Sequence, residues 1–212
     1  MDVKKLSITE FQQTIQKDPL VFFDSVLWST HWSKQDEIIE AVMKHQRVTV
    51  KSCFWVGKTY ISARIALLFQ YAYTDSIVIT TAPTFRQVEN VLWRELRNAH
   101  KKAKIPLWWT MLKTKFEIDE RWYMLWLSSD KEENFQWFHA EHQLNIVDEA
   151  GWVNAASLWA LEALMTSEWT KLLYIGNPIV PMWWFYDSFK DDSFVKISIS
   201  VFDTPNFKIN NI

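Results

Sequence analysis

The chain reads KSCFWVGKTY at residues 51–60, and this stretch decides which fold the sequence encodes. It ends in Gly57-Lys58-Thr59, between an apolar run that favours a strand and a stretch that favours a helix. In that setting backbone N–H groups can cradle phosphates, a lysine can reach the β- and γ-phosphates, and a threonine hydroxyl can hold Mg²⁺. Ser52 stands at the first position of the usual glycine-rich pattern, so this motif alone is also compatible with a plain strand-to-helix turn.

A second motif follows about ninety residues later, where the chain reads LNIVDEA at residues 144–150. This pattern indicates a buried strand that ends in two carboxylates. Asp148 can enter the coordination shell of Mg²⁺ and Glu149 can lie beside the attacking water, which is the division of labour that phosphoryl transfer requires. Each motif is modest evidence by itself. Together, in this order and at this spacing, they predict binding and hydrolysis of a nucleoside triphosphate.

Length and composition are those of one globular domain. The 212 residues can bury one sizeable core, and a content of 49% hydrophobic and 23% charged residues is ordinary. The formal charge of −2 supplies no overall basic field for nucleic acid, so any DNA contact has to be local or come from another part of the protein. The single Cys53 excludes an internal disulfide and is expected to be a small loop filler. The sequence shows neither a membrane span nor a signal core, which favours the cytoplasm.

The glycine and tryptophan counts are unusual. A chain of this length should hold about 15 glycines, yet it has 3 Gly and 14 Trp. Trp55 stands inside the phosphate loop, where positive φ and close backbone approach to the ligand favour glycine, so a real indole is expected to obstruct the phosphate seat. We hypothesise that many of these tryptophans represent glycine codons, for instance UGA, whereas Trp32 and Trp93 on helix faces are genuine. A tryptophan-rich or deliberately mutated protein is the alternative. The other suspect positions are Trp108, Trp109, Trp137, Trp152 and Trp169.

The rest of the chain alternates between strand and helix patterns. This alternation predicts an α/β fold of the P-loop NTPase type, with a mainly parallel central sheet flanked by helices on both faces and the ligand at the carboxyl ends of the strands. Asn145 is a polar side chain in a strand expected to be apolar on both faces, so it needs a partner if buried. The expected strands are 46–52, 76–81, 116–118, 123–127, 144–147, 171–175 and 195–201, and the expected helices are 35–44 with Ser33 as a possible cap, 58–73, 85–102, 157–165 and 183–189.

With these elements in place, the sequence resembles the ATPase domain of a tailed-phage terminase large subunit, the motor that packages viral DNA into a procapsid. The resemblance spans nearly the whole chain. Besides the two motifs, it is carried by WSKQ at 32–35, TAPTFRQ at 81–87, VLWRE at 91–95, YIGNP at 174–178 and SVFDTPN at 200–206.

The resemblance implies ATP and Mg²⁺ as cofactors and assigns a chemical role to four residues. Lys58 would hold phosphate, Thr59 and Asp148 would hold the metal ion, and Glu149 would position the water. Glu149, Lys58 and Asp148 would therefore form the catalytic set. The implied nucleotide-binding residues are Gln35, Ser52, Cys53, Val56, Gly57, Lys58, Thr59, Tyr60, Gly176 and Asn177.

Some of these residues also have a plainer interpretation. Gln35 would read adenine, but it could simply be a polar residue in the first turn of a helix. Gly176 and Asn177 would couple hydrolysis to movement, although Asn177 could be a turn former before a proline. A basic helix face could be solvated, could contact DNA, or could supply a charge-stabilising arginine finger. The residues of that face are Arg86, Arg94 and Arg97.

The implied organisation has three parts. Residues 1–45 would be an N-terminal helical segment with adenine-side residues, residues 46–205 the P-loop ATPase core, and residues 206–212 the start of a linker to an absent C-terminal nuclease domain. We therefore expect no nuclease activity from this sequence. The implied partners are double-stranded DNA, a terminase small subunit, the portal or procapsid and other copies in a homo-oligomeric ring, in the cytoplasm of the infected host cell. The alternatives are a helicase-like remodelling ATPase, or a nucleotide-blind partner-binding remnant if Trp55 blocks the loop.

Overall fold

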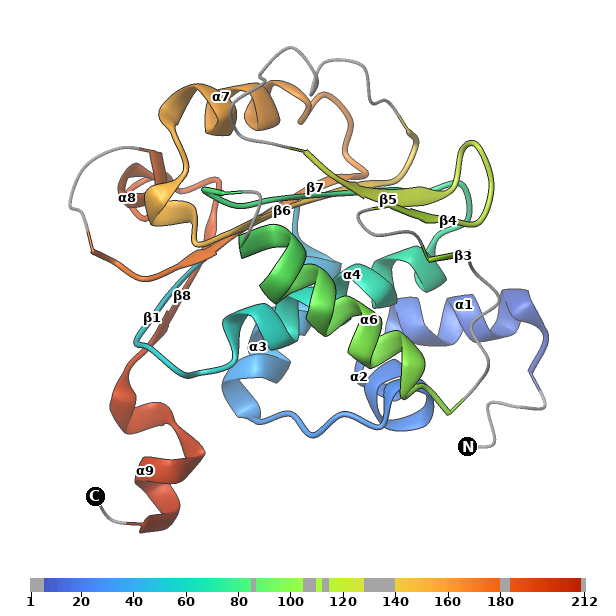
Figure 1. Cartoon of the computed structure of the whole chain (residues 1–212), viewed down its shortest axis with the longest axis horizontal. Coiled ribbons are helices and arrows are strands. Elements are labelled where there is room, and N and C mark those ends of the chain that lie inside the picture. The colour runs from blue at the N-terminus through green and yellow to red at the C-terminus, as the bar shows by residue number, and fades with distance from the viewer. Residues whose placement is uncertain are drawn as a thin grey trace.

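The fold is built on a mainly parallel sheet that lies between two layers of helices (Figure 1). The computed structural model describes residues 6–84, 87–104, 110–111, 115–127, 140–179 and 184–210. In these residues the sheet has eight strands in the order β3-β4-β5-β2-β6-β7-β1-β8. The strands are β1 (Arg47–Ser52), β2 (Ile77–Thr81), β3 (Thr110–Met111), β4 (Lys115–Glu117), β5 (Tyr123–Trp126), β6 (Gln143–Asp148), β7 (Thr170–Gly176) and β8 (Val195–Ile199).

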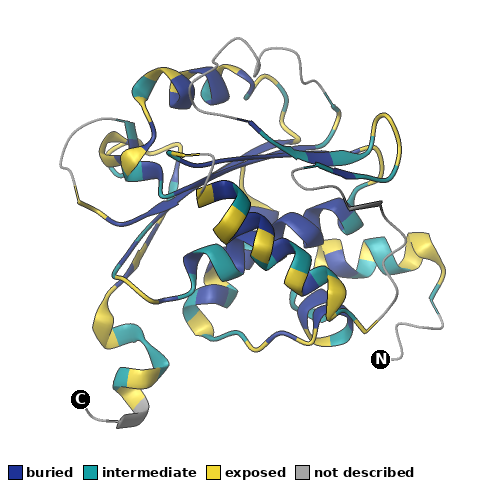
Figure 2. Cartoon of the chain, in the orientation of Figure 1, coloured by how far each residue is buried: buried dark blue, intermediate teal, exposed yellow. Residues whose placement is uncertain are grey.

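The predicted parallel sheet is confirmed, and so is the predicted hairpin. The strands from β5 through β8 in the sheet order run parallel to their neighbours, whereas β4 pairs antiparallel with β5 and with β3. Every residue of β2, β6 and β7 is buried, as Figure 2 shows for the centre of the sheet. Central strands that are covered on both faces are expected to be continuous apolar runs, and this is the pattern that predicts them from the sequence.

Helices cover both faces of the sheet. The N-terminal helices together with α4 and α6 share one hydrophobic core with the sheet, and α7 and α8 share a second core on the opposite face. Among the described residues, no helix has the length and the apolar character needed to cross a bilayer. The helical segments are α1 (Ile8–Lys17), α2 (Leu20–Phe22), η2 (Phe23–Leu27), α3 (Ser33–Lys44), α4 (Lys58–Ala72), η3 (Val88–Leu92), α6 (Trp93–Lys101), η5 (Ala150–Trp152), α7 (Ala155–Ala163), α8 (Trp184–Asp187), η6 (Val201–Asp203) and α9 (Pro205–Asn210).

Three sequence expectations about helices need correction. Ser33 is the first helical residue of α3 and not its cap, because the N-cap is Trp32 with an extended backbone and no capping side-chain bond. The helix expected over 85–102 is a π-helical segment, η3, that continues into α6, while residues 85 and 86 lie outside the described residues. The helix expected over 183–189 is only the short α8 in the described part of that range.

Asn145 and the end of the chain add two further observations. The side chain of Asn145 is fully buried in β6, and its Oδ1 accepts a hydrogen bond of 2.9 Å from Nε2 of Gln143. The partner that a buried amide requires is therefore present for the oxygen. Near the C-terminus, where the sequence indicated the start of a linker, the chain forms α9.

The described tryptophans differ in burial and in backbone conformation. Trp93 is 0% exposed, and its Nε1 donates a hydrogen bond of 3.0 Å to Oγ1 of Thr80. Trp55 and Trp28 are exposed and have left-handed φ values of 64° and 50°, which side chains with a Cβ disfavour. Trp28 terminates η2, the position where glycine is commonest at a helix end. Trp108, Trp109 and Trp137 lie outside the described residues, and the exposed Trp152 and Trp169 have no left-handed φ.

We predict that Trp93→Gly lowers the free energy of unfolding by about 4 kcal/mol or more, because it empties a core site and places glycine in a helix. Trp159→Gly is the matched control, since Trp159 also lies in a helix, α7, but is 60% exposed. The control should lose about 1 kcal/mol or less. Urea unfolding of both variants measures the difference, and equal losses would contradict the assignment of Trp93 to the core.

Candidate active site

The sheet topology brings the two sequence motifs together. Strand β7 lies between β1, which leads into the phosphate loop, and β6, which ends in Asp148. The register pairs Lys51 with Gly176 and Asp148 with Ile175, so the carboxyl ends of the three strands are level. Ligands of open α/β sheets bind at this edge. Residues that are far apart in the sequence therefore meet in one place.

The side chain of Gln35 in α3 is hydrogen-bonded to the phosphate loop. Its Nε2 donates a hydrogen bond of 3.2 Å to the carbonyl oxygen of Val56. Gly57 has a φ of +81°, and a Cβ at this position would lie 2.9 Å from the same Nε2. The left-handed backbone favours glycine here, and a Cβ would also force the Gln35 amide to shift. The amide nitrogen of Gln35 is therefore occupied by the loop. A contact between Gln35 and adenine remains a prediction.

Lys58 joins the phosphate loop to the ends of β6 and β7. Its side chain is 8% exposed, and Nζ donates a hydrogen bond to Oδ1 of Asn177. The same Nζ lies 3.8 Å from Oε1 of Glu149. Nδ2 of Asn177 is buried and has no hydrogen-bond partner in the described part of the chain. A buried donor of this kind is a group that a bound ligand can satisfy.

Thr59 and Asp148 form the second contact between the motifs. Oγ1 of Thr59 donates a hydrogen bond of 2.8 Å to Oδ2 of Asp148, and the backbone N–H of Glu149 donates one of 3.1 Å to Oδ1. The Asp148 side chain is buried, and this burial raises its pKa to about 6. A hydroxyl and a poorly compensated carboxylate are oxygen donors of the kind that Mg²⁺ prefers, so these residues fit the metal ion that the sequence implied.

The backbone around Glu149 is strained and tightly packed. Glu149 has a φ of 52°, a conformation that costs about 1–3 kcal/mol for a residue other than glycine. A Cβ on Gly176 would lie 3.0 Å from the backbone nitrogen of Ala150, and a Cβ on Gly151 would lie 3.0 Å from the carbonyl oxygen of Asn177. The two glycines therefore allow the ends of β6 and β7 to approach closely. This approach holds Asn177 and Glu149 beside Lys58.

The remaining loop residues have structural contacts. Ser52 is buried and its Oγ donates to the carbonyl oxygen of Cys53 at 3.1 Å, while the N–H of Cys53 donates to the carbonyl oxygen of Ile199 in β8 at 3.0 Å. The Tyr60 hydroxyl donates to the carbonyl oxygen of Thr30 at 3.1 Å. These bonds fix both ends of the loop. The predicted contacts of Ser52, Cys53 and Tyr60 with nucleotide remain predictions.

Trp55 adopts the positive φ that the phosphate loop was expected to need at this position. Its side chain is 100% exposed, so the indole lies in solvent and packs against no other part of the described chain. The neighbouring Phe54 is also exposed, and Nζ of Lys58 lies 5.9 Å from the centre of its ring. The loop thus forms with tryptophan at position 55, at the cost of a left-handed backbone.

One contact near the site was not predicted from the sequence. The guanidinium of Arg64 in α4 lies 3.2 Å from the centre of the Tyr60 ring, and its Nη1 lies 3.5 Å from Oε2 of Glu95 in α6. Burial lowers the pKa of Arg64, and its interactions with Tyr60 and Glu95 oppose this effect. The sequence pattern of α4 indicated only a buried helix, which favours apolar residues, so it gave no signal for this ion pair.

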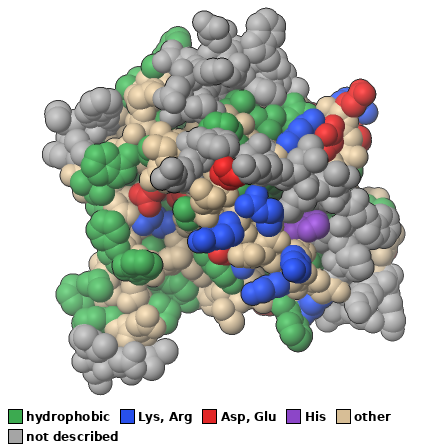
Figure 3. Space-filling view, in the orientation of Figure 1, with side chains coloured by type: hydrophobic (Ala, Val, Ile, Leu, Met, Phe, Trp, Pro, Cys, Tyr) green, Lys and Arg blue, Asp and Glu red, His purple; other side chains and the backbone are tan. Residues whose placement is uncertain are grey.

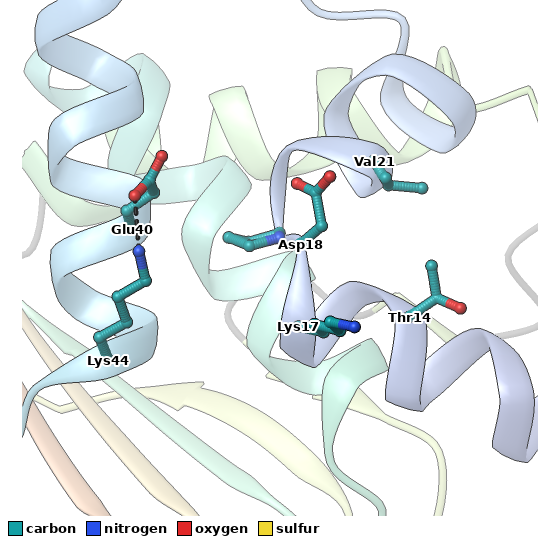
Figure 4. A pocket seen from close by; sticks show the side chains of 7 residues that line it. Thr14, Lys17, Asp18, Val21, Glu40 and Lys44 are labelled. Carbon is teal, nitrogen blue, oxygen red and sulfur yellow. Dashed lines mark hydrogen bonds and ion pairs between the residues drawn. The ribbon is translucent and has the colours of Figure 1, made fainter.

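The hollows in the described surface include one that adjoins the site and one that lies away from it. A hollow of about 480 Å³ lies beside the loop, with Cys53, Phe54 and Asn177 in its lining. The other, of about 580 Å³, lies between α1 and α3 and is lined by charged side chains (Figure 4). It contains none of the predicted site residues, and its Lys44 and Glu40 form an ordinary helix-surface ion pair of 2.7 Å. Such pairs contribute little, about 0.3–0.5 kcal/mol.

The fold is of the P-loop NTPase type, and Lys58, Thr59 and Asp148 lie at the carboxyl ends of its parallel strands. In sequence, the chain is 28% identical over 176 residues to a probable terminase large subunit of Enterobacteria phage P7, an alignment that covers 78% of this chain and 36% of that protein. The chain is thus similar in sequence to this phage protein, and it spans about a third of that protein's length. No protein-family model matches the sequence.

Solved structures agree on the fold. The large terminase of a thermophilic bacteriophage superposes with a TM-score of 0.67 at 12% identity, covering 86% of this chain and 50% of that one. A variant of the large terminase ATPase domain of Thermus phage P74-26 gives a TM-score of 0.66 at 16% identity and covers 89% and 88% of the two chains. The thermophilic phage protein in complex with ADP gives 0.65 at 12% identity, covering 84% and 48%.

We predict that Asp148→Asn makes the nucleotide-free protein more stable at neutral pH, by on the order of 2–3 kcal/mol. A folded-state pKa of about 6, above the ordinary value of 3.8, means that ionisation of Asp148 costs stability as pH rises through this range. The advantage of the variant should therefore be absent below about pH 4 and complete above about pH 7. Urea unfolding without divalent cations measures it, with the exposed Asp192→Asn as control. An advantage that does not change with pH would contradict this account.

Proposed function

We propose that this chain is the ATPase motor domain of a viral terminase large subunit, which hydrolyses ATP to drive double-stranded DNA into a procapsid. The observation that supports this proposal best is the meeting of the loop residue Lys58 with Asn177 and Glu149, beside the Thr59–Asp148 contact. A phosphate-binding lysine, a metal-binding hydroxyl and two acids of different environment are the parts that phosphoryl transfer needs.

In this proposal each side chain has one task. The Lys58 ammonium and the N–H groups at the first turn of α4, which have no intrahelical acceptor, bind the β- and γ-phosphates. Thr59 and Asp148 hold Mg²⁺, which neutralises phosphate charge when bound. Glu149, at the end of β6 and more exposed than Asp148, orients the attacking water. The close packing of Gly151 against the end of β7 keeps Glu149 in position.

Asn177 is well placed to report the state of the nucleotide. Its Oδ1 accepts a hydrogen bond from Lys58. A bound phosphate would compete for the same ammonium, so that nucleotide binding changes the partners of Asn177. Because Asn177 directly follows Gly176 at the end of β7, such a change is transmitted to the tightly packed junction with Gly151. Coupling of hydrolysis to movement is proposed to begin here.

The proposed organisation follows from these assignments. Residues 1–45 form the segment on the adenine side, 46–205 the catalytic core, and 206–212 the beginning of the connection to a nuclease domain.

The proposed partners are DNA, a small terminase subunit, the portal or procapsid and further copies of the chain in a ring. The structures of similar large terminases with ADP and with ATP-gamma-S support a nucleotide as ligand. The proposed location is the cytoplasm of an infected host cell.

We predict that Trp55→Gly raises the affinity for ATP by on the order of tenfold, because glycine lets the backbone of the phosphate loop approach the phosphates closely. The variant should also turn over ATP, and Lys58→Ala in the same background should abolish both binding and turnover. Equilibrium nucleotide binding and phosphate release measure these effects in the unchanged chain and in the variants. If neither form binds nucleotide, the motifs are relics and the ATPase proposal is wrong.

We predict that Glu149→Gln lowers turnover about 10²- to 10⁴-fold, because the amide cannot accept a proton from water. Binding of ATP should be nearly unchanged, since the proposed phosphate and metal contacts remain. The exposed Glu168→Gln provides a control with the same change in charge. A loss of binding equal to the loss of turnover would instead assign Glu149 to ligand binding, against the role proposed for it.

A further inference from the structure

Helix α6 carries a dense group of cations on its outer side. Trp93, Leu96 and Ala99 form the buried side of this helix. Residues 94–104 hold five of the 23 Lys and Arg residues of the chain, although the chain as a whole has a charge of −2. Figure 3 shows Lys and Arg side chains gathered over α6 in the middle of this face of the molecule. We call this surface the basic face; its residues are Arg94, Arg97, Lys101, Lys102 and Lys104.

Cations outnumber carboxylates five to one within residues 94–104. Arg97 donates from Nη2 to the carbonyl oxygen of Glu89 at 3.2 Å. The one carboxylate among residues 94–104 is Glu95, and its Oε2 faces Nη1 of the buried Arg64 at 3.5 Å. Lys104 donates to the backbone carbonyl of Asp24 at 2.7 Å and lies 4.7 Å from the Trp28 ring centre, neither of which removes its charge. A local concentration of like charge raises the free energy of the isolated chain and favours an anionic partner.

We propose that the basic face binds the phosphodiester backbone of DNA. At a rise of about 1.5 Å per residue, Arg94 to Lys101 extend over about 10 Å. Duplex DNA carries one negative charge per about 1.7 Å of its axis, so this length faces about six charges. An acidic protein segment offers a lower linear charge density, which makes a nucleic acid the better match. Contacts to phosphate are independent of base sequence, as a translocating motor requires.

The helix that carries the basic face is firmly attached to the nucleotide site. At its beginning, Nε1 of the buried Trp93 donates to Thr80 in β2 at 3.0 Å. Two residues further along, the Glu95–Arg64 ion pair connects α6 to α4, the helix whose first residues are Lys58 and Thr59. A polymer held on the basic face is thereby held at a fixed position relative to the phosphate loop. This inference deepens the packaging function proposed above and rests on it for the choice of DNA.

The test is direct binding of a short fluorescent DNA duplex, measured by anisotropy over a range of salt concentrations without nucleotide. The face variant replaces three exposed cations of α6 and its end, and the control variant replaces three exposed cations elsewhere, so that both change the net charge equally. The face variant is Arg94→Gln, Lys101→Gln and Lys102→Gln, and the control variant is Lys17→Gln, Lys44→Gln and Lys190→Gln.

We expect the face variant to bind DNA about tenfold or more weakly at low salt, and the control variant to bind like the unchanged chain. The salt dependence should also become shallower, by about 0.9 in log–log slope for each DNA phosphate that the variant no longer neutralises. Equal losses in both variants, or no DNA binding by the unchanged chain, would overturn the inference. Binding of an acidic peptide in place of DNA would overturn it as well.

A parallel measurement of nucleotide binding keeps this test distinct from that of the ATPase proposal. None of the replaced residues belongs to the phosphate loop or to the ends of β6 and β7, so both variants should bind ATP as the unchanged chain does. DNA binding that fails while nucleotide binding persists would reject the basic face alone. If the unchanged chain binds DNA but no nucleotide, the ATPase proposal is wrong, and the proposal that the basic face binds DNA is retained.

Discussion

The bond between Lys58 and Asn177 is the interaction on which the architecture of the site depends, because it joins the phosphate loop to the end of β7. It can form only because β7 lies between β1 and β6 and the three strands end at the same level. The second connection, from Thr59 to Asp148, needs the same strand order. A buried ammonium and a buried carboxylate are expensive to desolvate, and the surrounding polar contacts offset part of that cost.

Strain is concentrated around this connection. Trp55 and Glu149 have left-handed backbones, and Gly151 and Gly176 permit contacts that a side chain would prevent. Conformations of this kind cost about 1–3 kcal/mol each and persist only where the surrounding structure imposes them. Here the fully buried strands β6 and β7 and the two hydrophobic cores supply that support. The stable part of the fold thus holds a site that would not form by itself.

The fold class and the central strands could be predicted from the sequence, because buried parallel strands are continuous apolar runs and the two motifs follow them directly. The meeting of Lys58 with Asn177 could not be predicted from local pattern, since it depends on strand order. The π-helical start of the 85–102 segment, and the Arg64–Glu95 pair, escaped prediction for a similar reason: helical periodicity reports burial but not which partner an element meets. A capping box at Ser7 and Glu10 marks the start of α1 in the sequence, where we expected only a helical segment.

The most direct test of the central claim is a crystal structure with Mn²⁺ and ADP, in which anomalous scattering locates the metal ion. We predict a metal peak beside Oγ1 of Thr59 and the Asp148 carboxylate, with the β-phosphate against the N–H groups of the loop and Nζ of Lys58. A nucleotide bound in the charged hollow between α1 and α3, or a metal ion held away from both Thr59 and Asp148, would contradict it.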